Sequence, residues 1–166
     1  MASVLERATR PAVTAALQFT AKTGPAPVAL VKEPGSGPDQ RVGTFEEHEV
    51  VIHDGRAIAD RLDLDREGFV LLRRETAVKD FYDDAEVRRV YYPEMEALVR
   101  QATGAAKVIV FDHTIRVDDS GAQAERKVRA PVRNVHNDFT VRSAPQRVRD
   151  LLPADEAERR LTGRYG

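Results

Sequence analysis

The sequence predicts an α+β fold, and three kinds of pattern carry that prediction. An amphipathic helix is expected over residues 84–104, because apolar residues recur there at three- and four-residue spacing. Strands are expected at residues 50–52, 69–72, 107–117 and 132–140, where β-branched residues cluster or alternate with polar ones. Two short helices are expected at residues 143–152 and 154–161.

Helix boundaries are marked by particular residues. Asp84 is the expected N-cap of the long helix and Gly104 its C-terminal stop. Pro93 lies inside the helical pattern and lacks an amide donor, which predicts a kink near Tyr92. Ser143 is the expected N-cap of the next helix, with Gln at position 146 completing a capping box.

The chain divides into two regions by composition. Residues 1–44 are rich in Ala, Pro, Gly and Thr and are expected to form an N-terminal extension and loop, with Lys32–Gly43 exposed. Residues 45–166 hold the remaining predicted elements and are expected to form one domain, with a loop at 118–124.

Charge and composition exclude several classes of protein. The 166 residues balance 26 Lys and Arg against 27 Asp and Glu, so we do not expect a nucleic-acid partner, which would require a clustered basic excess. The sequence has no cysteine, which excludes disulfides, thiolate metal sites and a cysteine nucleophile. We expect a cytoplasmic protein without a membrane partner, because no apolar run approaches spanning length and no secretory signal is evident.

His136 and Asp138 form a His-x-Asp pattern within the expected strand 132–140. Residues two apart in a strand project to the same side, so this imidazole and carboxylate can hold one ion. They are two of the three ligand types of the 2-His-1-carboxylate triad, which binds iron(II) in oxygenases. A hydrogen-bonded surface pair is the alternative, and the tripeptide alone does not decide between them.

Three longer motifs surround this pair: YYPE at residues 91–94, FDHTIR at 111–116 and VHNDFT at 135–140. Together they resemble the AsaB-type hydroxylase/desaturase family, which includes the gibberellin-desaturase-like and CmcJ/NvfI-type oxidoreductases. The resemblance extends from about residue 46 to residue 163.

The resemblance implies a non-haem iron(II) and 2-oxoglutarate-dependent oxygenase on a double-stranded β-helix, a cupin-like jelly roll with flanking helices. It implies that His136 and Asp138 bind the iron. The implied reaction couples decarboxylation of 2-oxoglutarate to hydroxylation or desaturation of a small secondary metabolite. Arg116 is the candidate for binding the anionic co-substrate or substrate, because a guanidinium forms two-point contacts with carboxylates.

The family pattern places a second metal-binding His on a later strand, and this sequence has no His after His136. We therefore expect the chain to correspond to the N-terminal part of such an enzyme, with an incomplete sheet. The alternative function is a non-catalytic remnant or interaction module that pairs through an exposed sheet edge. Its partner would be a second copy of the chain or a separate C-terminal half.

The remaining histidines and the paired tyrosines have less specific interpretations. His113 shares a face with apolar residues, which favours a hydrogen-bonded core histidine over a substitute metal ligand. His48 and His53 are expected at the surface. Tyr91 and Tyr92 are expected to pack inside the fold, with the lining of a substrate pocket as the alternative.

Overall fold

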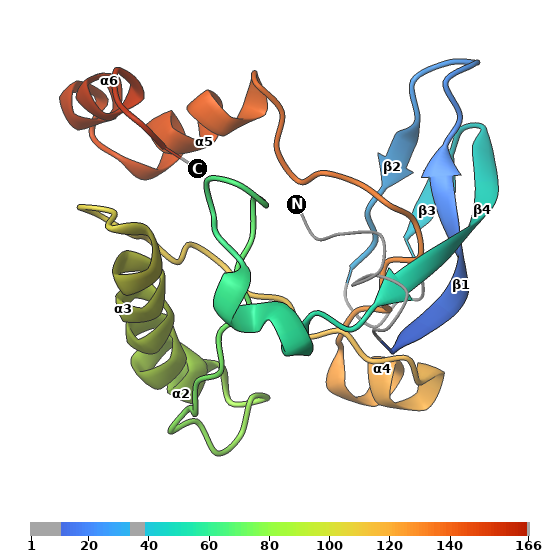
Figure 1. The fold of residues 1–166 in the computed structure, drawn as a ribbon, viewed down its shortest axis with the longest axis horizontal. Helices are drawn as coiled ribbons and strands as arrows, with labels where there is room; N and C mark the ends of the chain where they lie inside the picture. Colours follow the sequence, from blue (N-terminus) through green and yellow to red (C-terminus); the bar gives the residue numbers. More distant parts are fainter. Residues whose placement is uncertain (1–10, 34–38, 166) are drawn as a thin grey trace. The chain divides into compact units, whose positions relative to one another are not determined.

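The computed structural model describes residues 11–33 and 39–165. Contacts divide the chain into two units, Met1–Arg133 and Asn134–Gly166. All described strands lie in the first unit, and the second unit holds helices α5 (Ser143–Leu151) and α6 (Ala154–Leu161) (Figure 1). The predicted α+β class is confirmed at this level.

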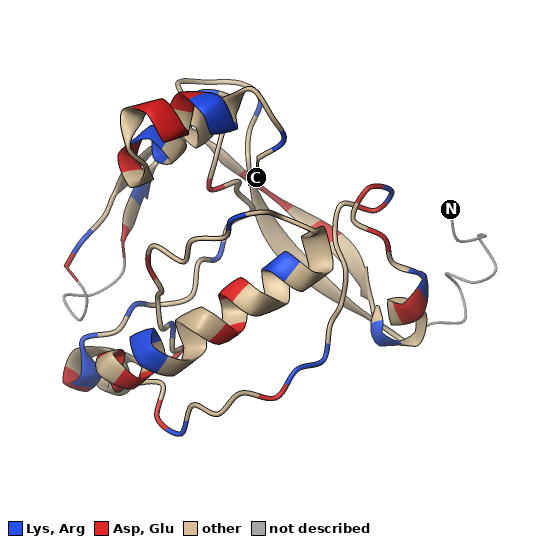
Figure 2. Ribbon diagram, turned by 90° about the vertical axis from the view of Figure 1, so that its left-hand side faces the viewer, with Lys and Arg blue, Asp and Glu red and all other residues tan. Residues whose placement is uncertain are grey.

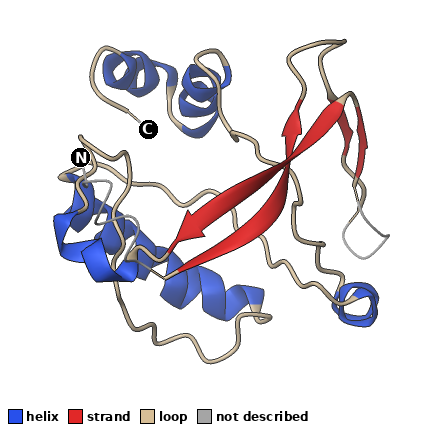
Figure 3. Cartoon of the chain, turned by 45° about the vertical axis from the view of Figure 1, so that its right-hand side comes forward, coloured by secondary structure: helices blue, strands red, loops and turns tan. Residues whose placement is uncertain are grey.

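The longest strands of the first unit form an antiparallel pair. β1 (Ala12–Thr20) runs beside β4 (Phe45–His53), and Figure 3 shows them as two long red strands. A shorter pair joins β2 (Val28–Leu30) to β3 (Gln40–Val42). The strand expected at residues 50–52 is therefore part of β4. β1 was not predicted, because its alanines have a low strand propensity.

β1 lies in the segment expected to be an extension and loop, and β3 lies within the loop expected at Lys32–Gly43. Residues 1–10 and 34–38 of that segment fall outside the described residues. The division of the chain at residue 44 stays a prediction.

The long helical segment is made of three consecutive parts. They are α2 (Asp84–Glu86), a π-helical turn (Val87–Tyr91) and α3 (Tyr92–Thr103). The irregularity predicted near Tyr92 is present as the π-helical turn, which ends just before Pro93. A proline ring clashes with the carbonyl of the preceding turn in a regular helix, and a wider turn relieves that clash.

The N-cap of this helix is Asp83 and not Asp84, which corrects the prediction by one residue. The Asp83 carboxylate accepts hydrogen bonds from the amides of Ala85 and Glu86, at 2.9 and 3.1 Å. Asp84 instead lies in the first turn and accepts a hydrogen bond from Arg88 Nε at 2.7 Å. An acidic side chain at either position interacts favourably with the positive, N-terminal end of the helix dipole.

The strands predicted at residues 69–72, 107–117 and 132–140 are absent, which corrects three predictions. Arg116 forms an isolated parallel bridge with Arg129, and Asn134 is a single bridge residue within the last of these segments. The bridge between Arg116 and Arg129 consists of hydrogen bonds from Val117 N to Arg129 O and from Arg129 N to Ile115 O, at 3.0 and 3.2 Å. Strand patterns in a sequence become strands only beside a partner, and the described residues place no further strand there.

Carboxylates of the long helix take the place of a neighbouring strand for the segment before it. Glu94 accepts hydrogen bonds from Thr76 Oγ1 and from the amide of Ala77, at 2.5 and 2.9 Å. Glu86 accepts from the amides of Lys79 and Asp80, at 3.2 and 3.0 Å. These contacts satisfy backbone donors that would otherwise need a sheet partner or water. Figure 2 shows charged residues of both signs along this helix.

Two further boundaries differ from the sequence prediction. Residues 118–124 were expected to form a loop, but α4 (Ser120–Arg126) begins there with Asp119 as its N-cap, which accepts from the amide of Ala122 at 2.7 Å. The capping box expected for α5 is replaced by one placed further upstream. Thr140 Oγ1 accepts from the amide of Ser143 at 3.1 Å, and Ser143 Oγ accepts from the amide of Thr140 at 2.9 Å.

Burial is sparse in both units. Among the described residues, Val87 in the first unit and Ala157 in the second are the buried apolar side chains. Many large apolar side chains are exposed, including Val13 at 64% and Phe69 at 56%. Because apolar burial is the main favourable term in folding, these exposed faces favour association with further protein surface.

Replacing Gly104 with Ala is expected to lower the free energy of unfolding by about 1 kcal/mol. Gly104 ends α3 with a φ of 68°, a left-handed conformation that a Cβ disfavours. Gly55→Ala is the matched control, because Gly55 has a φ of −82° and an added Cβ there meets no atom within 4 Å. Urea denaturation followed by circular dichroism measures both variants, and equal losses would contradict this assignment.

Glu94 is expected to make the stability of the first unit depend on pH. The Thr76 hydroxyl and the Ala77 amide hold the pKa of its carboxyl below the ordinary value of 4.5. Its contribution is therefore present above pH 4.5 and is lost as the pH falls through the lowered pKa of the folded state. Glu94→Gln should reduce stability at pH 7 and shrink the loss that acidification causes.

Urea titrations at pH 7 and pH 3 measure this effect. Glu125→Gln, on the exposed surface of α4, is the control and should leave the pH dependence unchanged. A Glu94→Gln protein with the pH dependence of the unmodified protein would show that these hydrogen bonds do not contribute.

Candidate metal centre

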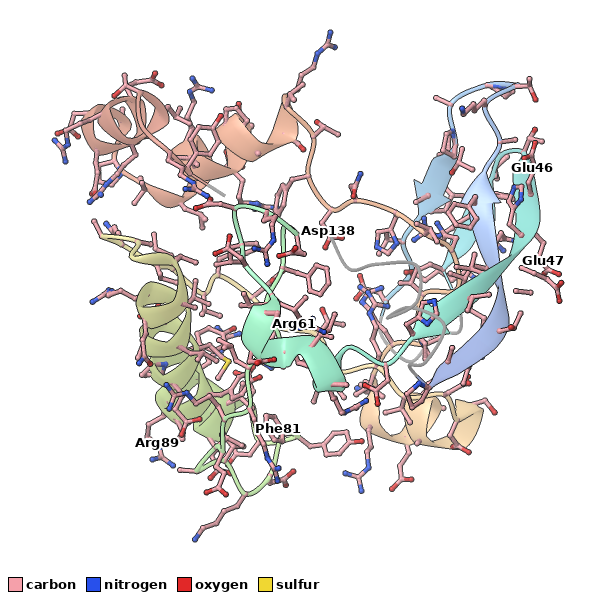
Figure 4. The ribbon with its side chains drawn as sticks, viewed as in Figure 1. Glu46, Glu47, Arg61, Phe81, Arg89 and Asp138 are labelled. Atoms are coloured by element: carbon pink, nitrogen blue, oxygen red, sulfur yellow. The ribbon has the colours of Figure 1, made fainter. Side chains whose placement is uncertain are left out.

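His136 and Asp138 lie in the second unit, on the segment that leads into α5, and Figure 4 labels Asp138 there. His136 Nε2 is 3.4 Å from Asp138 Oδ1. The side chains are 38% and 82% exposed, so the pair is open to solvent. The two side chains lie side by side, but not on the regular strand from which the sequence analysis expected this, and their role toward a metal stays a prediction.

The ring of His136 is oriented by the backbone. Its Nδ1 lies 2.9 Å from the carbonyl oxygen of Asn134. A carbonyl oxygen only accepts hydrogen bonds, so Nδ1 carries a proton and donates it there. In the neutral imidazole this leaves the Nε2 lone pair available on the side that faces Asp138. Metal-binding histidines are commonly oriented by such a contact from the second ring nitrogen.

The donor atoms of this pair fit a ferrous ion in their chemistry. Imidazole nitrogen with carboxylate oxygen is the ligand mixture of non-haem iron(II) centres. Two ligands at right angles and about 2.1 Å from an ion are about 3 Å apart, close to the 3.4 Å separation in this pair. Within residues 11–33 and 39–165, no group of three or more His, Cys, Asp or Glu side chains is arranged to hold a metal.

Arg116, the candidate anion-binding residue, lies in the first unit. Its Nη1 donates to the carbonyl oxygen of Ala130 at 2.8 Å, and the side chain is otherwise exposed. This contact holds one arm of the guanidinium beside the bridge between Arg116 and Arg129. The role of Arg116 toward an anion stays a prediction.

His113 connects two of the sequence motifs. Its Nδ1 is 2.9 Å from the hydroxyl of Tyr92, and their rings pack edge to face with centroids 5.6 Å apart. Its Nε2 lies 3.6 Å from Asp84 Oδ1. The Arg88 guanidinium, which also hydrogen-bonds Asp84, holds the pKa of that carboxyl below its usual range. His113 is thus a half-buried, hydrogen-bonded residue as expected, and Tyr92 is a packing residue.

The two histidines of β4 differ from each other. His48 lies at the surface as expected, with Nε2 3.3 Å from Glu46 Oε2. His53 is half-buried, and its Nδ1 is buried without a hydrogen-bond partner among the described residues, which corrects the expectation of a surface residue. An unpaired buried nitrogen is unfavourable unless a ligand or water contacts it.

His53 lines an open cavity of about 460 Å³ in the first unit. The cavity is lined by the end of β4, by the 3₁₀ helix Arg56–Arg61 that follows it and by the residues near position 70. The sequence analysis missed it, because no local pattern indicates that these parts of the chain line one cavity. Most of the lining side chains are apolar, and the full set is His53, Asp54, Gly55, Arg56, Ile58, Leu62, Phe69, Val70 and Leu71. The volume is in the usual range for small-molecule sites.

Across the described part of the chain, no helix combines the length and apolar character needed to cross a bilayer.

Comparison with known proteins identifies relatives along most of the chain. A family model described as an oxidoreductase/YMDC permease-like domain matches residues 17–166. The oxidoreductase AN1597 of Emericella nidulans is 32% identical over 112 residues, which cover 64% of this chain and 38% of that protein. The hydroxylase/desaturase efuI of Hormonema carpetanum is 32% identical over 117 residues, which cover 64% of this chain and 39% of that protein. The chain thus spans about two fifths of the length of these relatives.

A solved structure extends this similarity to the fold. The iron and alpha-ketoglutarate-dependent endoperoxidase NvfI aligns with 93% of this chain and with 57% of its own chain, with a TM-score of 0.72 and 27% sequence identity. The family match covers nearly the whole sequence, and the motifs at residues 91–94, 111–116 and 135–140 lie inside it. The protein therefore belongs to the oxidoreductase/YMDC permease-like family, the AsaB-type hydroxylases and desaturases that its motifs resemble.

Proposed function

We propose that this chain forms part of an iron(II)- and 2-oxoglutarate-dependent oxygenase, a hydroxylase or desaturase that acts on a small secondary metabolite. The observation that carries the proposal is the pair formed by His136 and Asp138. Its Nε2 and Oδ1 atoms lie 3.4 Å apart, while Nδ1 is occupied by the Asn134 carbonyl. The similarity to an iron and alpha-ketoglutarate-dependent endoperoxidase supports the choice of metal and co-substrate.

Each residue of the pair has a separate task. Asn134 holds the imidazole of His136 in the tautomer that offers Nε2 to a metal. Asp138 supplies a charged oxygen that offsets the charge of a divalent cation. Bound iron with 2-oxoglutarate would supply the oxidising chemistry that protein side chains lack. The exposure of both side chains is consistent with a centre that needs further protein to close it.

A third protein ligand is required for the triad. The other histidines of the chain, His48, His53 and His113, all lie in the first unit. Two of them already have partners, since His48 contacts Glu46 and His113 contacts Tyr92. We propose that the remaining ligand and the remaining strands of a cupin-like jelly roll come from protein beyond these 166 residues. The alignment with only 57% of the NvfI chain supports this proposal.

The cavity next to His53 is the candidate site for the apolar body of a small molecule. Ile58, Leu62 and Phe69 provide apolar walls, and the polar residues His53, Asp54 and Arg56 line the same cavity. Such a combination suits a hydrophobic metabolite that carries a hydroxyl or carbonyl group. Phe69→Ser should weaken binding of an apolar fluorescent probe to the protein, and unchanged binding would contradict this assignment.

Substitution of either residue of the pair is expected to weaken iron(II) binding about tenfold or more, because each substitution removes a metal ligand. Loss of a residue that merely orients a ligand already weakens metal affinity by about tenfold or more. The variants are His136→Gln and Asp138→Asn. His48→Gln is the matched control, because His48 and Glu46 are also two residues apart, with a similar nitrogen-to-oxygen distance of 3.3 Å.

The measurement is anaerobic iron(II) titration followed by paramagnetic broadening of the histidine ring signals, which detects weak sites. In the unmodified protein the His136 signal should broaden at a lower iron concentration than that of His48. Equal broadening of the two rings would contradict a metal role for His136.

Arg116→Lys is expected to weaken binding of 2-oxoglutarate about tenfold in the presence of iron(II), because lysine keeps the charge but loses the two-point guanidinium contact. Calorimetric titration with 2-oxoglutarate measures the change. Arg133→Lys is the control, since the Arg133 guanidinium binds the carboxylate of Asp118 at 2.6 and 2.8 Å. An equal effect of both substitutions would reject a specific role for Arg116.

A further inference from the structure

Alternate residues of β1 direct their backbone N–H and C=O groups toward β4 or away from it. The hydrogen bonds that flank the pair run from Ala21 N to Thr44 O and from Asp54 N to Pro11 O. Because bonded and non-bonded pairs alternate in an antiparallel ladder, the odd-numbered residues of β1 bond to β4. The even-numbered residues, from Ala12 to Thr20, direct their N–H and C=O groups to the opposite edge. Within the described residues, no strand occupies that edge.

The β1 edge lacks the features that normally prevent strand pairing. β1 reads AVTAALQFT, with no charged residue and no proline, and its register with β4 is continuous, without a bulge. β4 carries Glu46, Glu47 and Glu49, and Figure 4 shows the first two on the outer side of the sheet. Charges on an edge strand discourage pairing, and an uncharged edge of this length invites it. The open edge of this sheet is therefore that of β1.

The side chains of β1 are self-complementary in an antiparallel arrangement. Val13, Ala15, Leu17 and Phe19 share one face, and Val13 is 64% exposed. When two copies of the strand pair around Ala16, Val13 lies opposite Phe19 and Ala15 lies opposite Leu17. The apolar face then continues across the junction. The outward-facing groups of the even-numbered residues pair with one another in the same register.

We propose that two copies of this chain associate through the free edge of β1, antiparallel and centred on Ala16, and so join their β1–β4 pairs into one sheet. The arrangement has two-fold symmetry, so each copy contributes the same surface. The absence of charge on β1 favours a second copy as the occupant, because a like-charged edge such as that of β4 would repel its own copy. The pairing holds whether or not His136 and Asp138 bind iron.

The register is tested with charges placed at Thr14 and Gln18. In a pairing centred on Ala16, residue 14 of one copy lies opposite residue 18 of the other. A Thr14→Lys/Gln18→Lys variant places like charges opposite each other, which should raise the dimer dissociation constant about tenfold. A Thr14→Glu/Gln18→Glu variant should do the same. Mixing the two variants should restore the dimer as a heterodimer, because Lys then lies opposite Glu.

A proline at the centre of the edge gives an independent test. Ala16→Pro removes one outward-facing N–H and no bond to β4. Glu49→Pro is the matched control, because Glu49 is the cross-strand partner of Ala16 and its N–H faces the other edge. Only Ala16→Pro should abolish the dimer, while circular dichroism should show equal secondary structure in both variants.

Light scattering coupled to size-exclusion chromatography measures the mass of each protein over a range of concentrations. A dimer that is lost in Ala16→Pro and rescued by the mixed charge variants supports the proposal. A monomer at the highest soluble concentration overturns it. Dimers that survive Ala16→Pro, or higher oligomers in place of dimers, overturn the closed pairing through β1.

Discussion

Hydrogen bonds to side chains of the long helix order the extended segments that run beside it. Segment 74–80 runs beside the long helix with contacts in antiparallel order: Arg74 to Gln101, Ala77 to Glu94 and Asp80 to Glu86. The segment that follows the helix also contacts it, because the amide of Val110 donates to Glu96 at 3.3 Å. A charged acceptor makes a stronger hydrogen bond than a neutral carbonyl, so a few side chains organise a long irregular stretch. The helix itself contains the YYPE motif, and its contact at Val110 lies directly before the FDHTIR motif.

The two motifs of the first unit meet at Tyr92 and His113. Tyr92 of the YYPE motif touches His113 of the FDHTIR motif, and Asp84 and Arg88 surround that contact from the preceding helical turns. Arg88 also lies over the Tyr92 ring, 5.4 Å from its centroid. A polar network of this kind specifies one arrangement of its segments, because each donor and acceptor has a particular partner. The residues that identify the family in this part of the chain thus include residues that hold its structure.

The His136–Asp138 pair depends on local geometry. All three contributing positions, Asn134, His136 and Asp138, lie within five consecutive residues, so no distant segment is needed to bring them together. The proposed iron centre would need a ligand beyond this pair, because a facial triad has three protein ligands. The chain spans about two fifths of the length of the relatives AN1597 and efuI.

Few apolar side chains are buried, just as few extended segments have a strand partner. Only Val87 and Ala157 are buried apolar residues among those described, and the described strands form two separate two-stranded sheets. An isolated two-stranded ribbon is marginally stable in water. Exposed apolar residues on β1 and on the segment near Phe69 are therefore surfaces that association with further protein would stabilise.

The sequence by itself determined the features that depend on neighbouring residues. These are the long helix with its stop at Gly104 and its irregular turn before Pro93, the two C-terminal helices, the family, and the approach of His136 to Asp138. Each follows from spacing or from the stereochemistry of one residue.

Only the tertiary structure decided which extended segments become strands. The alternating pattern of 107–117 predicted a strand but found only an isolated bridge, whereas the alanine-rich β1 became a strand beside β4. The sequence did not indicate the cavity at His53 either, because no local pattern specifies that residues 69–71 line the same cavity as residues 53–62. The physical reason is that a strand is stabilised by hydrogen bonds to another segment, and no local pattern specifies where that segment lies.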